Sequence, residues 1–318
     1  MMMNRVLKRL NIFILYRFGS AIGDQLCMSA IVENLCDQHK LNVIVFSNYS
    51  ELFENNPKVY KNYSFKKIPK LLRNTLLTVL RRCEGEHIAS FCFPADKEHT
   101  LEHYMRSSRA KISLIEAHAL HFRKKLTVKN AIPKLYFSDN ELQRFAVKFK
   151  DLPAHYSIVQ PIGKTTYTPN KEWGFKKFQN VIKSTREVNW VQTGLSNDLL
   201  LDNAIDCRGR TESLRELAYI ISKADYILCL EGLFNHLAAS VGTTSFCIFS
   251  GFHPTEIALY PTTVPIVLNP QAECSPCWLL EQCPNKKYCT EGIRPEDVTR
   301  AIKENPIQTK PVRHHIIA

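Results

Sequence analysis

The sequence has no apolar segment long enough to cross a lipid bilayer. A membrane-spanning helix needs about 18 or more uncharged apolar residues in a row, and no stretch of the 318 residues approaches that length. Gly and Pro, with 11 and 16 residues, are not in the excess that is typical of disordered chains. With 45% hydrophobic and 23% charged residues, we expect a soluble globular protein rather than an integral membrane protein.

The first residues lack the features of a secretory signal peptide, although basic residues precede apolar ones. The uninterrupted apolar run covers only residues 12–16, Arg17 follows it directly, and no small-residue cleavage site is present. We expect this run to form a buried strand.

The cysteines do not have the pattern of a disulfide framework. Their number, 11, is odd, and several lie inside apolar runs, such as Cys92, Cys229 and Cys247. Free cysteine packs as a small buried hydrophobe. The pattern predicts reduced thiols and a cytoplasmic location.

The positive charge lies almost entirely in one half of the chain. Residues 1–150 contain 25 Lys and Arg against 13 Asp and Glu, whereas residues 151–318 contain 17 of each. This asymmetry indicates an anionic partner of the first half, such as a phosphorylated substrate, a membrane surface or nucleic acid. A solvated basic surface with no specific partner is the alternative.

Short apolar runs alternate with segments of helical period, which predicts an α/β fold with parallel sheets. Two similar units, 1–152 and 153–318, are the simplest organisation, and the last helix has the option of packing back on the first unit. Ser213 and Glu216 predict a capping box at the start of a helix. The expected strands are 12–16, 43–47, 87–93, 156–160, 189–193, 226–230 and 245–249.

An acidic residue, a glycine and a histidine follow one of the expected buried strands. Glu231 and Gly232 leave strand 226–230, and His236 lies in the first turn of the next helix. Helix N-termini favour anions, so a diphosphate fits here with His236 as a further donor, while Glu231 accepts hydrogen bonds from sugar hydroxyls. The alternative is a capped helix with a packed histidine.

The segment 222–256 resembles the glycosyltransferase family 9 heptosyltransferases. In that family an acid, two small residues and a histidine leave a strand, and a second strand leads to a Gly/Pro turn. The segment departs from the family pattern at Leu233, where glycine is usual. The similarity extends from about residue 12 to about residue 302 and is weakest over 60–135.

A second strand-to-helix turn contains a carboxylate. Gly19, Gly23 and Asp24 follow the first strand, and glycine permits tight turning and close backbone approach. The turn is similar to the family's Gly-Asp pair, which implies that Asp24 is the catalytic base. Arg17 at the start of the turn is a candidate contact for the acceptor or for phosphate. An aspartate that merely caps the following helix is the alternative.

A third turn follows strand 156–160. Hydroxyl groups of Thr165 and Thr166 and the ammonium of Lys171 suit a diphosphate, because a lysine offsets charge on a departing nucleotide. The segment resembles the family's paired hydroxyl residues followed by Lys-x-Trp, here ending at Trp173. An ordinary basic loop is the alternative.

Four cysteines occur within 16 residues near the end of the chain: Cys274, Cys277, Cys283 and Cys289. Four thiolates can hold a tetrahedral zinc ion, although the single C-x-x-C and the unequal spacings are not specific for zinc; the resemblance to family 9 favours buried thiols. The family often has further cysteines around a Cys-x-Pro-Cys at this place, and the resemblance implies enzymes without a required metal or other cofactor.

The resemblance implies a GT-B fold, with two Rossmann-like domains facing across a cleft. The nucleotide-sugar donor would bind the C-terminal domain and the acceptor the N-terminal one. The reaction would invert the anomeric carbon, with Asp24 as general base. The family's commonest donor is ADP-heptose, and its acceptors are the lipopolysaccharide core and related surface glycans of the bacterial cell envelope.

The basic first half suits an anionic glycolipid acceptor at the inner face of the bacterial inner membrane. A leucine-rich helix over 69–82 either lies on anionic headgroups or packs its leucines into the first domain, and the second option is favoured. The basic residues around it are Lys66, Lys67, Lys70, Arg73, Arg81 and Arg82.

Three other interpretations stay open. A family member with a different nucleotide sugar is one of them. A nucleic-acid-binding protein would explain the basic half, although no recognisable binding motif or Arg/aromatic interleaving is present. A zinc-stabilised interaction protein without activity is the third.

Overall fold

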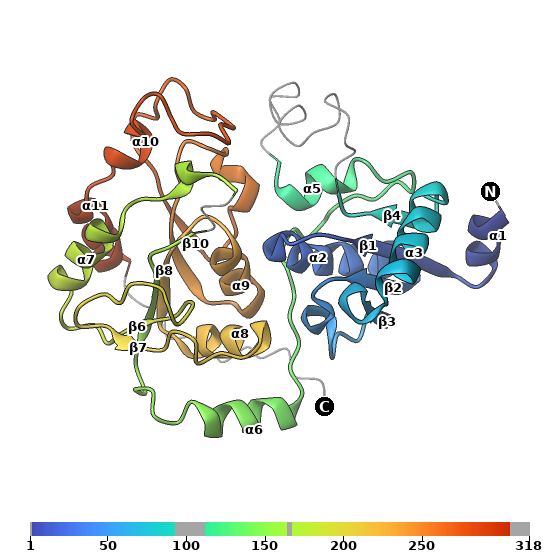
Figure 1. The fold of residues 1–318 in the computed structure, drawn as a ribbon, viewed down its shortest axis with the longest axis horizontal. Helices are drawn as coiled ribbons and strands as arrows, with labels where there is room; N and C mark the ends of the chain where they lie inside the picture. The colour runs from blue at the N-terminus through green and yellow to red at the C-terminus, as the bar shows by residue number, and fades with distance from the viewer. Residues whose placement is uncertain (1, 93–111, 164–166, 306–318) are drawn as a thin grey trace. The chain divides into compact units, whose positions relative to one another are not determined.

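The chain divides into two compact units, each built on its own parallel sheet (Figure 1). The computed structural model describes residues 2–92, 112–163 and 167–305. The first unit comprises residues 1–139, and the second begins at Asn140. The α/β class expected from the sequence is therefore confirmed.

The division lies at the start of helix α6 (Asp139–Lys148), whereas the sequence suggested a division between residues 152 and 153. The cause is a buried ion pair that joins α6 to helix α8 (Leu214–Lys223). The Arg215 guanidinium donates to both carboxylate oxygens of Glu141 at 2.6 and 2.8 Å. The sequence predicted a helix over residues 138–150 as the last element of the first unit, but this pair fixes the helix to the second unit.

The first unit has a four-stranded parallel sheet in the order β3-β2-β1-β4. One face of β1 packs against helices α1 and α3, and the other unit-1 helices include α2 and α5, which contact each other. The elements are α1 (Met2–Arg9), β1 (Ile12–Arg17), α2 (Ile22–His39), β2 (Asn42–Ser47), η1 (Ser50–Phe53), β3 (Val59–Ser64), η2 (Phe65–Lys67), α3 (Lys70–Arg82), β4 (Ile88–Ser90) and α5 (Leu114–Ala119).

The second unit has a six-stranded parallel sheet in the order β10-β9-β8-β5-β6-β7. The chain runs outward from β5 to β7 and then returns to run outward from β8 to β10. The strand order therefore reverses between β5 and β8, and ligands of open α/β sheets bind beyond the carboxyl ends of the strands at such a point. The strands are β5 (Ser157–Gln160), β6 (Trp190–Gln192), β7 (Ile205–Asp206), β8 (Tyr226–Leu230), β9 (Thr244–Ile248) and β10 (Thr263–Ile266).

The last described helix, α11 (Pro295–Glu304), belongs to the second unit. It packs against α7 (Phe175–Ser184) and β9, and its buried Val298 and Ile302 join the core below that sheet. The option that the last helix of the chain packs back on the first unit stays a prediction. The remaining elements of the unit are η4 (Pro169–Lys171), α9 (Leu233–Val241), η5 (Thr255–Ala258) and α10 (Tyr288–Glu291).

The expected capping box of α8 is only half formed. The Ser213 hydroxyl accepts from the Glu216 amide at 3.1 Å, as predicted. The Glu216 carboxylate, however, accepts from the Glu212 amide and pairs with Lys148 at 2.9 Å. A lysine from α6 thus competes for the carboxylate that would close the box. No helix among the described ranges is long and apolar enough to span a membrane.

Candidate active site

Asp24 lies in the first turn of α2, directly beyond the end of β1. Its Oδ2 accepts from Nη2 of Arg17, the last residue of β1, at 2.5 Å. The other guanidinium nitrogen, Nη1, donates to the backbone carbonyl of Phe91, just after β4. Arg17 thus joins the carboxyl ends of two strands and orients Asp24, whose side chain is 29% exposed and accessible to a substrate.

A buried glutamine, which the sequence did not single out, fixes the loop before Asp24. The Gln25 Nε2 donates to the Gly19 carbonyl at 2.9 Å, and its Oε1 accepts from the Ser47 hydroxyl at 2.6 Å and from the Asn48 amide at 2.8 Å. Gly19 has φ 145°, a conformation that favours glycine. The loop is therefore held to the end of β2 by one fully buried side chain.

A buried histidine, His118, lies near Arg17. The ring of His118 in α5 stacks on Phe91 with centroids 3.9 Å apart. Burial is the main cause that lowers the pKa of His118 well below the ordinary value, and the nearby positive charges of Arg17 and His121 add to it. His118 is therefore neutral at physiological pH.

This neutral histidine predicts a loss of stability in mild acid. Because the unfolded chain takes up a proton near pH 6.5 and the folded chain does not, the free energy of unfolding should fall below that pH. The slope should reach up to about 1.4 kcal/mol per pH unit. Urea unfolding of the wild type and of His118→Phe between pH 5 and 8 measures it, and the variant should show a shallower slope. Equal slopes for the two proteins would show that folding does not lower the pKa of His118.

In the second unit, Lys171, Glu231 and His253 form a buried cluster of charged and polar groups. The Glu231 carboxylate lies 2.5 Å from Lys171 Nζ and 3.3 Å from His253 Nδ1. Burial by itself would raise the pKa of Glu231, but the Lys171 ammonium and then His253 outweigh it and hold this pKa well below its usual range. Glu231 is therefore ionised, and His253 is a site residue that the sequence did not reveal.

The cluster lies at the carboxyl end of β8, in front of the N-terminus of α9. Gly232 adopts φ 151°, and a Cβ built on it would meet no atom within 4 Å. The space beside Gly232 is therefore open among the described residues, and the backbone N–H groups of the first turn of α9 favour an anion at this end of the helix.

The His236 side chain is buried and hydrogen-bonded within the protein. Its Nδ1 lies 2.6 Å from the Tyr260 hydroxyl, and its ring is buried. The neighbouring Asn235 donates to the Ala258 carbonyl at 2.7 Å. The segment after β9 therefore fixes the first turn of α9. The sequence predicted that His236 lies in this turn, but not the contacts that hold it there.

The segment that carries Lys171 is held in place by hydrogen bonds to the cysteine-rich segment. Thr168 Oγ1 and Asn170 Nδ2 donate to the Leu279 carbonyl at 2.9 and 2.6 Å. The ammonium also lies 5.3 Å from the ring centre of Phe252, within cation–π range. Thr165 and Thr166, which the sequence predicted beside Lys171, lie outside the described residues.

The cysteine-rich segment contains no disulfide among its four cysteines. Within the described residues no three His, Cys, Asp or Glu side chains are placed to hold a metal ion. The segment pairs with the loop after β9, because the Cys277 and Trp278 amides donate to the Gly251 and Phe252 carbonyls. The Trp278 ring packs against His253 at 4.5 Å, so this segment supports the Glu231 cluster.

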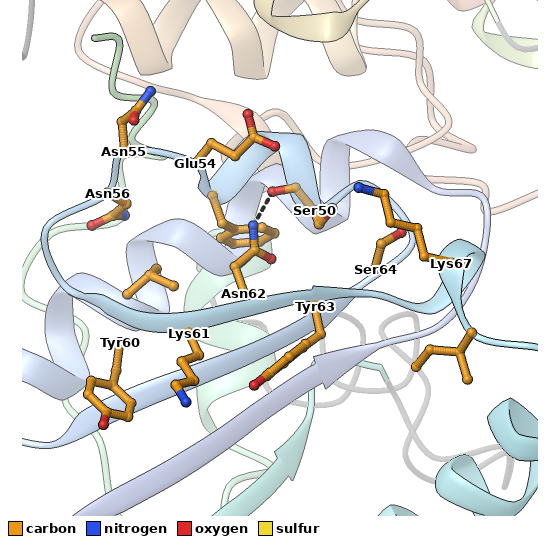
Figure 2. A pocket seen from close by; sticks show the side chains of 13 residues that line it. Ser50, Glu54, Asn55, Asn56, Tyr60, Lys61, Asn62, Tyr63, Ser64 and Lys67 are labelled. Atoms are coloured by element: carbon orange, nitrogen blue, oxygen red, sulfur yellow. Dashed lines mark hydrogen bonds between the residues drawn. The ribbon is translucent and has the colours of Figure 1, made fainter.

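A separate cavity of about 610 Å³ lies along the edge strand β3 and contains none of the predicted site residues. Figure 2 shows Asn62 and Glu54 on one side of the strand, and Tyr60, Lys61 and Tyr63 on the other. The Asn62 amide donates to the Ser50 carbonyl at 2.5 Å. The cavity therefore follows the open edge of the sheet rather than the carboxyl ends of its strands.

The sequence profile of glycosyltransferase family 9 (heptosyltransferase) matches residues 101–289. No curated protein sequence matches the chain.

Solved structures are similar at low identity. The family 9 glycosyltransferase from Veillonella parvula DSM 2008 is 14% identical with a TM-score of 0.66, over 92% of this chain and 96% of the other. The ADP-heptose lipopolysaccharide heptosyltransferase II of E. coli is also 14% identical, with a TM-score of 0.62 over 92% and 98%. The iron-containing dodecameric glycosyltransferase TibC from enterotoxigenic E. coli H10407 is 14% identical, with a TM-score of 0.63 over 92% and 75%.

These structures have the GT-B fold, and the two parallel-sheet units of this chain agree with it. The profile match covers more than half of the 318 residues. The chain thus belongs to glycosyltransferase family 9 and is a glycosyltransferase.

Proposed function

We propose that this glycosyltransferase moves a heptose from ADP-heptose to a hydroxyl of the lipopolysaccharide core or a related bacterial surface glycan. The donor is suggested by similar heptosyltransferase structures that contain ADP-D-β-D-heptose or an ADP-heptose analogue. In this proposal the second unit binds the donor and the first unit binds the acceptor. The enzyme works in the cytoplasm or at the inner face of the inner membrane.

The Lys171–Glu231 pair in front of α9 is the observation that carries the proposal. An ammonium has three N–H donors, so its bond to Glu231 leaves donors for phosphate oxygens. The open space beside Gly232 lies next to the first turn of α9, whose backbone N–H groups suit the same ligand. The ionised carboxylate of Glu231 accepts hydrogen bonds from ribose or sugar hydroxyls.

The transfer itself is assigned to Asp24. Its carboxylate takes the proton of the acceptor hydroxyl while that oxygen bonds to the anomeric carbon and the bond from this carbon to the phosphate oxygen breaks. The incoming oxygen attacks opposite the leaving group, so the configuration inverts. Charge that develops on the departing diphosphate is stabilised by Lys171 and the α9 N-terminus, and the residues of the chain suffice for this step without a metal ion or other cofactor.

Leu233 favours a second candidate within the same class. It is the first residue of α9 and stands where the family usually has glycine, so it narrows the space next to the proposed phosphate site. A different nucleotide sugar, used for capsule or another surface glycan, is the alternative donor.

Thermal unfolding with a panel of nucleotides and nucleotide sugars tests the donor. A ligand at 100 times its Kd should stabilise the protein by about 2.7 kcal/mol, and ADP and ADP-heptose should do so while UDP and GDP compounds do not. Glu231→Ala and His236→Ala should weaken the effect. His155→Ala, at a histidine whose side chain is 86% exposed, is the control. A larger shift with another nucleotide sugar would replace the donor assignment, and no shift with any nucleotide would overturn the site.

A further inference from the structure

Helix α3 carries apolar side chains on its buried side and also on its exposed side. Leu77 and Leu80 are buried in the core that covers β1, as the packing interpretation of the sequence expected. Leu71 and Leu72, however, are 78% and 61% exposed, and Val79 is also exposed. At 100° per residue these three side chains fall within one quarter to one third of the helix circumference, so they form an outward apolar stripe.

Helix α1 repeats this arrangement. Leu7 is buried in the same core, whereas Met2, Val6 and Leu10 are exposed at 81%, 49% and 57%. Their spacing of four residues places them on one side. Helices α1 and α3 therefore pack on the same core with one side, and each presents an apolar stripe to solvent on the other side.

The two helices are joined to each other. The Asn4 Nδ2 in α1 donates at 2.8 Å to the carbonyl of Cys83, the residue that ends α3. Both pack on the face of β1 that carries Ile12, Ile14 and Tyr16, and Figure 1 shows them beside the same sheet. Both helices therefore lie on the same side of the first unit's sheet, with their apolar stripes away from its core.

The charge of this surface is predominantly positive. Residues 2–11 and 65–83 contain nine Lys or Arg and no Asp or Glu, and the exposed Glu84 and Glu86 follow the end of α3. Arg82, which is exposed, lies between Leu71 and Val79 on the helix circumference. Leucine stripes among basic side chains are typical of helices that lie in the interface of an anionic membrane.

We propose that α1 and α3 together form a docking surface for an anionic phospholipid bilayer. The leucine, valine and methionine side chains would enter the boundary between headgroups and acyl chains, and the basic side chains would pair with phosphates. Nucleic acid would use the charges but would leave the apolar stripes in water, and a second copy of this surface would bring two predominantly positive surfaces against each other. The bilayer is the occupant that satisfies both features.

The docking surface is connected to the candidate base. The Arg73 guanidinium in α3 lies 5.3 Å from the ring centre of Phe18, which begins the loop that leads to Asp24. A bilayer under α1 and α3 would therefore bring this loop near a membrane-embedded acceptor. This last point rests on the proposed function, whereas membrane binding itself does not.

Vesicle co-sedimentation of the full chain measures the binding. Vesicles of phosphatidylethanolamine and phosphatidylglycerol should bind the protein, and binding should rise with phosphatidylglycerol content and fall as salt shortens the Debye length. Vesicles of phosphatidylcholine should bind little. Arg5→Gln with Arg82→Gln should lower the partition coefficient about 25-fold, because each basic residue near the surface contributes about fivefold.

The apolar stripe is tested with Leu71→Ser/Leu72→Ser, which should lower the partition coefficient by about tenfold or more. Leu195→Ser/Leu199→Ser, at leucines that are 68% and 66% exposed in the second unit, is the matched control and should bind like the wild type. Thermal unfolding of each variant checks that it is folded.

Two results would overturn the docking surface: absence of binding to anionic vesicles at low salt, or binding that the Leu71/Leu72 variant retains. Tight RNA binding that depends on Arg5 and Arg82, without vesicle binding, would assign the surface to nucleic acid. A dimer that the Leu71/Leu72 variant abolishes, again without vesicle binding, would make it a protein interface. Vesicle binding needs no donor, so normal binding without sugar transfer would instead count against the proposed function.

Discussion

Replacing Asp24 by asparagine is expected to lower the rate of sugar transfer by about 10²–10⁴-fold, the usual contribution of a general base. The amide has nearly the same shape and keeps an oxygen for the Arg17 guanidinium, but it does not take a proton at neutral pH. Affinity for the nucleotide sugar should be unchanged, because the proposed donor residues lie in the second unit. Turnover with an authentic acceptor and donor binding by calorimetry measure the two quantities.

Asp37→Asn provides a matched control on the same helix. Asp37 lies in the last turns of α2, and its side chain is 65% exposed and pairs with Lys58. This variant should transfer sugar at the wild-type rate. Near-normal turnover of Asp24→Asn would show that the base lies elsewhere, and loss of donor binding in that variant would show that its effect is structural.

Lys171→Met is expected to lower the free energy of unfolding by about 3–5 kcal/mol at pH 7, because removal of one partner leaves a buried charge without its counter-ion. Glu231 is buried, with 9% of its side chain exposed. The double variant Lys171→Met/Glu231→Gln should recover much of this loss, because it removes the uncompensated carboxylate. Urea unfolding of the wild type, both single variants and the double variant gives the coupling free energy.

The effect should also depend on pH in a definite direction. Because the folded protein holds the pKa of Glu231 below its ordinary value, the ion pair stabilises the fold above the unfolded pKa near 4.5 and this stabilisation is lost as the pH falls toward the folded value. Lys177→Met, which breaks an accessible pair with Glu291, should cost no more than about 1 kcal/mol. Equal losses in the two lysine variants would contradict a buried, energetically important Lys171–Glu231 pair.

The sequence was sufficient to find the buried strands and the residues that follow them. Strand β8 has the predicted limits, 226–230, because five apolar residues are bounded by a charged residue on each side. Asp24 and Glu231 were identifiable because each follows such a strand, where parallel sheets present their ligands.

Two strands and one helix were not predicted because their sequences lack a clear apolar pattern. Strand β3 was missed because it is an edge strand with alternating polar side chains, among them the exposed Tyr60 and Tyr63. Strand β10 was missed because it is short and contains Pro265, which is tolerated at a sheet edge. Helix α1 was missed because only one of its residues, Leu7, is buried.

The partners of the site residues also depend on tertiary structure. His253 and Tyr260 follow β9, more than 20 residues after Glu231 and His236, which they contact. They meet because β8 and β9 are neighbours in the sheet. The Arg17–Asp24 pair joins the two ends of a single loop, and nothing in the order of the residues shows that the loop closes in this way.

The hydrogen bonds of the Gln25 side chain have a consequence for protein engineering. The loop that carries Asp24 is shaped by an amide in α2 and by Ser47 and Asn48 at the end of β2, so its conformation is not encoded by the loop alone. A chimera that takes residues 18–24 from a relative to change acceptor preference should also take residue 25 and positions 47 and 48. Transplanting the loop by itself would exchange the side chains without the scaffold that holds them.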